Sequence, residues 1–295
     1  GGASDQNRLI WDGITIYHKG HLFGMISPLN PNVTSEIKFI NKGAHARYGE
    51  RLSSVIDVSS RTDISNETTA ELGFNGISAD ALLDIPIIKD KLNIQASYMD
   101  VFETVTFNQL ADKVFESTKI KDIENGNNDF LFSDYNVKLN YKPNKKNRLY
   151  ASVISIENQL DYSVNDSDNN TSYTDRLMTT NTGYGLGWSI DWSKKISQTT
   201  TAFFSDYKLN YNFITKENNE QTSDFEKRNT IYDSGISSEL RINVSENSNV
   251  TFGYQYTLKD VAYAFLNTTN LVFVLDTEDN IVQTHSLFGS YDYSN

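Results

Sequence analysis

The chain has 295 residues, no cysteine and a formal net charge of −12. The acidic balance argues against a nucleic-acid-binding surface, which needs clustered Lys and Arg. The lack of cysteine excludes disulfides, thiolate metal sites and Cys nucleophiles. No run approaches the roughly 18 apolar residues of a transmembrane helix. The mean hydropathy of −0.49 is compatible with a membrane β-barrel, because the apolar and polar residues that alternate along each strand cancel in such an average.

Residues 1–62 differ from the rest, with two of the four Pro and three of the four His. The turn dipeptide Asp12-Gly13 predicts strand, turn, strand over residues 8–16. Two prolines predict an irregular segment or a helical turn over 27–32. Short strands are expected over 36–40 and 52–59. Residues 1–62 therefore form a small α+β module in this interpretation, and residues 63–295 form a second region.

From Thr68 onward, side chains alternate between apolar and polar in segment after segment. In residues 131–141 one face carries Leu131, Tyr135, Val137 and Leu139. Because strand side chains alternate faces, each segment has one apolar and one polar side. The same alternation occurs over 184–192 and 203–213, where we expect the apolar side to hold Phe203, Ser205, Tyr207, Leu209, Tyr211 and Phe213. About ten such strands suit a large barrel with lipid outside and water inside.

The expected connections alternate between short and long. Tight turns are predicted near residues 76–78, 88–91, 143–147, 194–198 and 245–249, and long loops over 103–129, 159–176, 216–228 and 267–280. Short turns at one rim and long loops at the other are typical of outer-membrane barrels, whereas a soluble sandwich mixes the two. The fold class predicted is mainly β: a partial, open antiparallel transmembrane barrel.

The expected turns and loops also give the orientation of the barrel in the membrane. Tight turns rich in Lys and Asn are expected at the periplasm, and the acidic long loops outside the cell. The lipid-facing set is Leu92, Ile94, Ala96, Tyr98, Ile236, Leu240, Ile242, Val250, Phe252, Tyr254, Tyr256, Leu258, Leu287, Tyr291 and Tyr293. The lumen-facing set is Asn93, Gln95, Ser97, Glu239, Arg241, Asn243, Thr251, Gln255 and Lys259. Several runs exceed the 9–11 residues or so that cross the bilayer, so their strands should project beyond it.

Motifs in residues 1–62 resemble the second half of the plug domain of TonB-dependent outer-membrane receptors. The run Gly1-Gly2-Ala3-Ser4-Asp5-Gln6-Asn7 is similar to the opening of that half-plug, and Asp12-Gly13-Ile14 to its Asp-Gly turn. His21-Leu22-Phe23-Gly24 through Asn30-Pro31 resembles the His-Leu-Phe-Gly…Asn-Pro segment. Lys42-Gly43, Arg47-Tyr48-Gly49 and Leu52-Ser53-Ser54-Val55 resemble the run that precedes the first barrel strand. The plug-motif positions are Asp12, Gly13, His21, Gly24, Gly43, Tyr48 and Gly49.

The resemblance implies a plug inside a barrel of about 22 strands, of which this chain is a fragment. Such receptors bind a scarce nutrient (a siderophore, cobalamin, a glycan or a peptide) and import it into the periplasm. It also implies the cell outer membrane as location, with membrane lipid, the nutrient and a TonB complex acting through a missing N-terminal region as partners, and a surface lipoprotein as a further candidate. No enzyme activity, cofactor or nucleic acid is expected. The alternative is a secreted or surface-attached all-β binding protein or adhesin.

Four groups of residues are candidates for sites. The resemblance implies that Arg47, Glu50 and Arg51 pair with barrel-wall carboxylates; a solvated charge cluster is the other interpretation. His18 and His21 have the spacing of metal ligands but lack further partners, which favours a structural role. Asp12-Gly13 is a turn rather than a catalytic acid. The expected long loops hold acidic and aromatic residues that suit sugar or Ca²⁺ binding or simple solvation: Asp161, Tyr162, Asp166, Asp168, Tyr173, Asp276, Glu278 and Asp279.

Overall fold

The computed structural model describes residues 7–18, 20–21, 27–40, 48, 54–74, 78–101, 123–166, 170–269 and 273–293. Its first four strands form a small sheet in the order β2-β1-β4-β3: β1 (Asn7–Trp11), β2 (Ile14–Ile16), β3 (Thr34–Ile40) and β4 (Ser54–Ser60). Strands β1 and β4 are parallel and the other pairs antiparallel. The strands expected in this region are confirmed. The described part of residues 1–62 contains no α-helix, so the helical component expected there is not seen.

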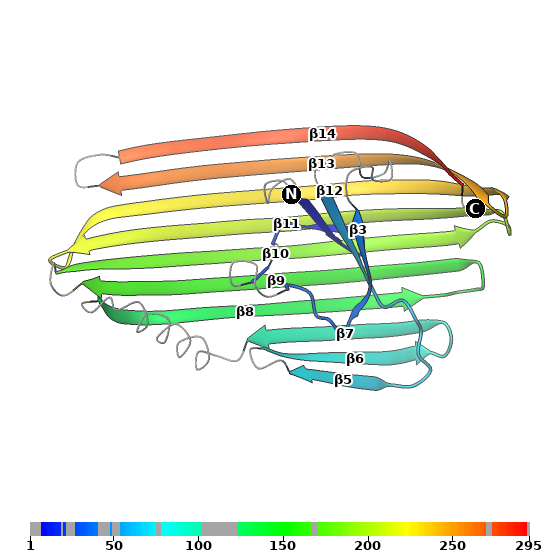
Figure 1. The fold of residues 1–295 in the computed structure, drawn as a ribbon, viewed down its shortest axis with the longest axis horizontal. Coiled ribbons are helices and arrows are strands. Elements are labelled where there is room, and N and C mark those ends of the chain that lie inside the picture. The colour runs from blue at the N-terminus through cyan, green and yellow to red at the C-terminus, as the bar shows by residue number, and fades with distance from the viewer. Residues whose placement is uncertain are drawn as a thin grey trace.

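The remaining ten strands form one antiparallel sheet in sequence order, as expected. They are β5 (Thr69–Phe74), β6 (Ser78–Ile88), β7 (Leu92–Val101), β8 (Ile123–Tyr141), β9 (Asn147–Asp166), β10 (Thr171–Asp191), β11 (Ile196–Glu217), β12 (Glu220–Ser245), β13 (Ser248–Thr269) and β14 (Phe273–Tyr293). The sheet stays open, with β5 and β14 at its two ends. Figure 1 shows the small sheet, in blue, crossing the long strands of the large one. Among the described residues, no helix is long and apolar enough to span a membrane.

The large sheet exposes its apolar residues and buries its polar ones. On β8, Asn136 and Lys138 are 5% and 1% exposed, while Tyr135 and Val137 are 48% and 41% exposed. The polar face meets the small sheet, and among the described residues the apolar side chains of the other face are exposed. A soluble sandwich would bury the apolar rows between two sheets instead. This inverted arrangement is that of a membrane barrel wall, whose outer face contacts lipid.

Burial confirms the predicted faces of β7 and β8. Asn93, Gln95 and Ser97 are buried on the inner face of β7, while Tyr98 lies on the outer face. Thr251 on β13 is likewise buried, and Phe252 beside it is exposed. The alternation therefore locates the lumen side of these strands from sequence alone.

The predicted face of β11 is wrong. Ser205 is fully buried on the inner face, and Phe204 is exposed on the outer one. The register explains the inversion, because Ser205 lies opposite Gly183 and Asp233, which both face the small sheet. Tyr207 therefore points inward and meets Tyr17 with ring centroids 5.8 Å apart. Aromatic residues occur on both sides of this strand, so composition alone misassigns it.

The predicted long loops are mostly strand. Strand β9 continues to Asp166, β11 to Glu217 and β13 to Thr269, and the next strands begin within a few residues. The β11–β12 hairpin turns at Asn218 and Asn219, both with positive φ (53° and 66°), as a two-residue hairpin turn requires. Of the 103–129 loop, the structure describes only the residues from 123, which belong to β8. Most of the residues predicted to lie in long loops therefore belong to long strands.

Aromatic rings form two bands on the exposed face. Phe204 stands between Tyr184 and Tyr232, with centroids 6.4 and 6.3 Å away. Nearer the short turns, Trp188 and Trp192 meet edge to face at 6.3 Å. Eight residues separate Tyr184 from Trp192, about 26 Å of strand. Tilt reduces this to about 20 Å, close to the apolar height of an outer-membrane barrel.

Candidate plug–barrel interface

The small sheet, here called the plug sheet, is held on the large one by an apolar cluster. Trp11, Ile14 and Ile16 are almost fully buried and pack with residues from three barrel strands. Those partners are Leu82 of β6, Ile154 and Ile156 of β9, and Phe203 of β11. This core lies between the two sheets, so burial of apolar area contributes to seating the plug sheet.

Two glycines of β10 allow Ile14 to approach the wall. A Cβ added at Gly183 would lie 2.4 Å from Ile14 Cγ2, and one at Gly185 would lie 3.0 Å from Ile14 Cγ1. Ile14 is fully buried and packed within the apolar cluster. Glycine at these positions is therefore a packing requirement of the interface.

We predict that Gly183→Ala loosens the plug sheet. Overpacking of this kind costs about 1–3 kcal/mol. The matched control is Gly289→Ala, where the nearest atom to an added Cβ is 3.6 Å away. The measurement is the urea concentration at which residues 1–62 become accessible to protease in the complete receptor. Equal midpoints for the two variants would contradict the packing argument.

A buried ion pair lies at the Asp12-Gly13 turn. Lys138 Nζ of β8 is 3.1 Å from the Asp12 carboxylate and donates to Ser60 Oγ at 2.7 Å. The Ser60 amide donates to Asp12 Oδ1 at 2.9 Å, and Tyr150 OH donates to the Asp12 carbonyl at 2.7 Å. Lys138 Nζ also lies over the Tyr150 ring, 4.8 Å from its centroid. The turn is thus a polar anchor between the plug sheet and the wall.

A chain of four side chains crosses the interface nearby. Thr179 Oγ1 is 3.1 Å from His18 Nδ1, His18 Nε2 is 3.3 Å from His21 Nδ1, and His21 Nε2 is 2.9 Å from Asp134 Oδ2. With both rings neutral, each ring can donate once and accept once: the Thr179 hydroxyl donates to His18, His18 to His21, and His21 to the Asp134 carboxylate. The His21 ring stacks on Phe132 at 4.1 Å. The chain links β10 to β8 through the plug segment.

Burial holds both histidines in the neutral form. The pKa of His18 is lowered to about 4, first by burial and then by the charge of His21. Burial also lowers the pKa of His21 to about 4, against a smaller opposing effect of a hydrogen bond with Asn158. Within the described ranges, no three His, Asp or Glu side chains are arranged to hold a metal ion. The two rings connect β10 to β8 through their hydrogen bonds, which is a structural role.

Tyr17 adds a further contact with the wall. Its amide donates to Asn181 Oδ1 at 2.7 Å, and its hydroxyl donates to Asp233 Oδ2 at 2.8 Å. Asn181 Nδ2 in turn donates to Ser205 Oγ at 2.9 Å. The loop after β2 is therefore bonded to β10 and β12, two strands apart in the sheet.

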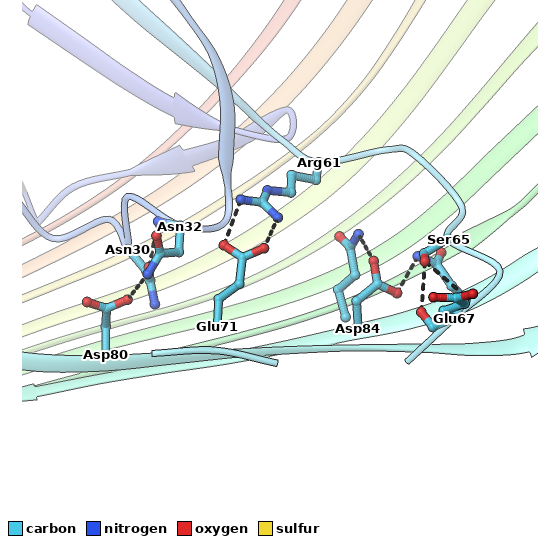
Figure 2. Close-up of polar contacts among 10 residues, drawn as sticks. Asn30, Asn32, Arg61, Ser65, Glu67, Glu71, Asp80 and Asp84 are labelled. Atoms are coloured by element: carbon cyan, nitrogen blue, oxygen red, sulfur yellow. Dashed lines mark hydrogen bonds and ion pairs between the residues drawn. The ribbon is translucent and has the colours of Figure 1, made fainter. Parts of the chain in front are cut away.

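Polar contacts join the segment between β4 and β5, and the one before β3, to strands β5 and β6. Figure 2 shows both guanidinium nitrogens of Arg61 on the Glu71 carboxylate, at 2.6 and 3.0 Å. Glu71 raises the pKa of Arg61 further above its usual range. Asn32, which precedes β3, donates to Asp80 of β6 at 2.5 Å (Figure 2). The side chains of Arg61 and Glu71 are both more than one-third exposed, so their pair contributes little to stability. Its main effect is to orient the segment between β4 and β5.

The structure describes only part of the predicted site set. Asp12 and Gly13 form the turn with φ of 47° and 85°, His21 is buried, and Tyr48 OH donates to Asp57 at 2.6 Å. Gly24, Gly43, Gly49 and the proposed pairing residues Arg47, Glu50 and Arg51 lie outside the described residues. Among the described residues, the ion pairs of Lys or Arg that join plug to wall are Asp12–Lys138 and Arg61–Glu71. Sequence reasoning missed Lys138, although a Lys among inward-facing polar residues of β8 was the available signal.

Comparison with known structures gives the same fold. Solved structures that resemble the chain include the ferric yersiniabactin uptake receptor FyuA from Yersinia pestis (TM-score 0.53, 10% identity, 96% of this chain and 52% of that one). The ferric citrate transporter FecA matches with TM-score 0.56 and 8% identity, over 99% and 52%. The alcaligin outer-membrane receptor FauA from Bordetella pertussis matches with TM-score 0.51 and 9% identity, over 97% and 51%. No protein-family model and no curated protein matches the chain.

These matches define the class of fold. The solved structures are TonB-dependent receptors, and the chain has their fold: an open ten-stranded part of the barrel with a small sheet on its inner face. The chain spans about half the length of each of them. The resemblance stated from the plug motifs is thereby confirmed at the level of the fold.

Proposed function

We propose that the chain is part of a TonB-dependent outer-membrane receptor that binds a scarce nutrient outside the cell and imports it into the periplasm. In this proposal residues 1–62 are the second half of the plug and residues 63–295 the first barrel strands. The nutrient is a siderophore, cobalamin, a glycan or a peptide. Energy comes from a TonB complex acting through a region outside this chain, and a surface lipoprotein is a candidate partner on the outer side.

The observation that carries the proposal is the polar seating of the plug sheet. Charged and amide side chains that a soluble protein would expose are buried between plug sheet and wall: Lys138, Asp134, Asn181 and Asp233. Such contacts are individually close to neutral in stability, because burying the charges costs about as much as the pairing returns. An interface built from them holds a plug in place and still lets an applied force separate it.

The strand extensions offer a wall for the ligand. On the inner face Phe225 lies 5.7 Å from Tyr211 and 4.9 Å from Phe265, in both cases edge to face. Phe225 shares this face with Asp233, eight residues along β12. Tyr162, Tyr173, Asp276 and Glu278, expected in loops, lie in these extended strands. We propose that this aromatic wall contacts the ligand above the plug and that the short turns face the periplasm.

Growth on single nutrient sources tests the proposal. Strains with and without the complete receptor gene are supplied with a ferric siderophore, cobalamin, an oligosaccharide or a peptide as the limiting source. We expect one source to require the gene and an intact TonB complex. We also expect Phe225→Ala to lower uptake of that source about tenfold or more, with Leu287→Ala on the exposed face as the control. Equal growth on every source, with the protein in the soluble fraction, would support a secreted binding protein instead.

A further inference from the structure

Three short turns at one end of the large sheet concentrate positive charge. Residues 89–91, 142–148 and 191–195 hold eight Lys or Arg and two Asp, in a chain whose net charge is −12. The lysines of this basic rim are all exposed: Lys89, Lys91, Lys142, Lys145, Lys146, Lys194 and Lys195. The fourth short turn, between β12 and β13, holds Glu246 and no Lys. The positive charge is therefore confined to the β6–β11 side of the rim.

The basic rim begins where the exposed apolar face ends. Ile88 precedes Lys89, Tyr141 precedes Lys142, and Trp192 lies two residues before Lys194, and all three apolar side chains are exposed. Aromatic rings of this kind settle at the boundary between acyl chains and headgroups. The lysines beside them are therefore held at headgroup depth, with their stems along the apolar edge and their ammonium groups in water.

The acidic groups of the basic rim already have partners. The Asp90 carboxylate accepts a hydrogen bond from Asn66 Nδ2 at 2.7 Å, and Asp191 pairs with Arg148 at 3.1 Å. Acidic residues at the opposite end, such as Glu217 and Glu220, lie about 20 residues away along β11 and β12. The charge of the lysines is thus directed outward at one membrane boundary.

We propose that the basic rim binds the phosphate groups of anionic phospholipids in the leaflet that surrounds the short turns. Lys binds phosphate as a compact point charge and needs no fixed fork geometry. Lysines close to an anionic leaflet gain about 1 kcal/mol each, which is about fivefold in lipid affinity per lysine. The inference rests on the proposed membrane location, and it adds a lipid preference that neither the fold nor nutrient import requires.

Lipid retention tests the inference. The complete receptor is incorporated into nanodiscs of equal phosphatidylcholine and phosphatidylglycerol, and the lipids that stay bound after detergent extraction are quantified by native mass spectrometry. We expect phosphatidylglycerol to be enriched in the wild type. Enrichment should fall in K145Q/K146Q, by at most about 25-fold, and should fall further in K145Q/K146Q/K194Q/K195Q. It should also fall at 0.5 M salt, which screens the charges. The matched control K208Q/K216Q removes the same charge from the far part of β11 and should keep the enrichment.

Each outcome has one meaning. Equal enrichment in the quadruple variant and the wild type, or an equal loss in the control, overturns the lipid inference while leaving the proposed receptor function intact. A receptor that remains soluble and does not enter nanodiscs overturns both. Enrichment that depends on the rim lysines, in a receptor that imports none of the nutrients, supports the inference and counts against the proposed function.

Discussion

Lys138→Met should release the plug sheet at lower denaturant than any exposed-charge variant. The substitution keeps most of the side-chain volume and leaves the buried Asp12 carboxylate without its cation. Removing one partner of a buried pair costs about 3–5 kcal/mol, because the remaining charge is desolvated and unpaired. The measurement is the urea midpoint for protease cleavage within residues 1–62 of the complete receptor.

A double variant separates charge from packing. Asp12→Asn keeps the shape of the side chain, and Asn tolerates the positive φ of 47° at this turn. The pair D12N/K138M should therefore recover a large part of the loss seen in Lys138→Met. Lys208→Met, which removes an exposed pair with Asp206, should change the midpoint by about 1 kcal/mol or less. A Lys138→Met receptor with wild-type plug retention would refute the anchor.

Acidification should also weaken the plug sheet, through the two histidines. Their pKa values are about 4 in the folded protein, against an ordinary value of 6.5. Between those values the unfolded chain binds protons that the native interface excludes, so stability falls as the pH drops from about 6.5 to about 4. The loss approaches about 3 kcal/mol for each histidine at the acid end. The measurement is the urea midpoint for plug release at a series of pH values.

The histidine contribution is obtained by difference, because carboxylates also titrate in acid. H18Q/H21Q removes both rings, so its midpoint should vary much less with pH between 6.5 and 4 than that of the wild type. His285→Gln, on the exposed face of β14, is the matched control and should keep the wild-type slope. Parallel pH profiles for all three proteins would show that the histidine chain does not couple plug retention to protons.

The alternation of side chains predicts most of the large sheet. Asn93, Gln95, Asn136 and Lys138 can be placed on the inner face because a single period of two runs through β7 and β8. The same rule fails for β11, where Phe203 and Phe204 are adjacent and only the register with Gly183 decides the face. Pairing partners are a property of the folded sheet, and local sequence does not specify them.

The contacts between the plug sheet and the wall are harder to predict from the sequence than the strands are. Asp12-Gly13 predicts its own turn through local chemistry, but the partner of Asp12 is Lys138, 126 residues away. The sequence shows the spacing of His18 and His21, but their hydrogen-bond partners Asp134 and Thr179 come from two barrel strands. The outer parts of the long strands are not recognisable in the sequence, because the apolar alternation ends before the strands do.

The exposed apolar face of the large sheet should contact lipid, and cysteine variants of this chain, which has no cysteine of its own, allow a direct measurement. Single variants Ile236→Cys and Ser237→Cys are labelled with an environment-sensitive fluorophore in the complete receptor, and brominated lipids serve as quenchers. Quenching at 236 but not at 237, with the same alternation for Phe252→Cys and Gln255→Cys, is the predicted result. Labels at 236 and 252 that resist brominated lipid, in a protein that is monomeric without detergent, would contradict the account.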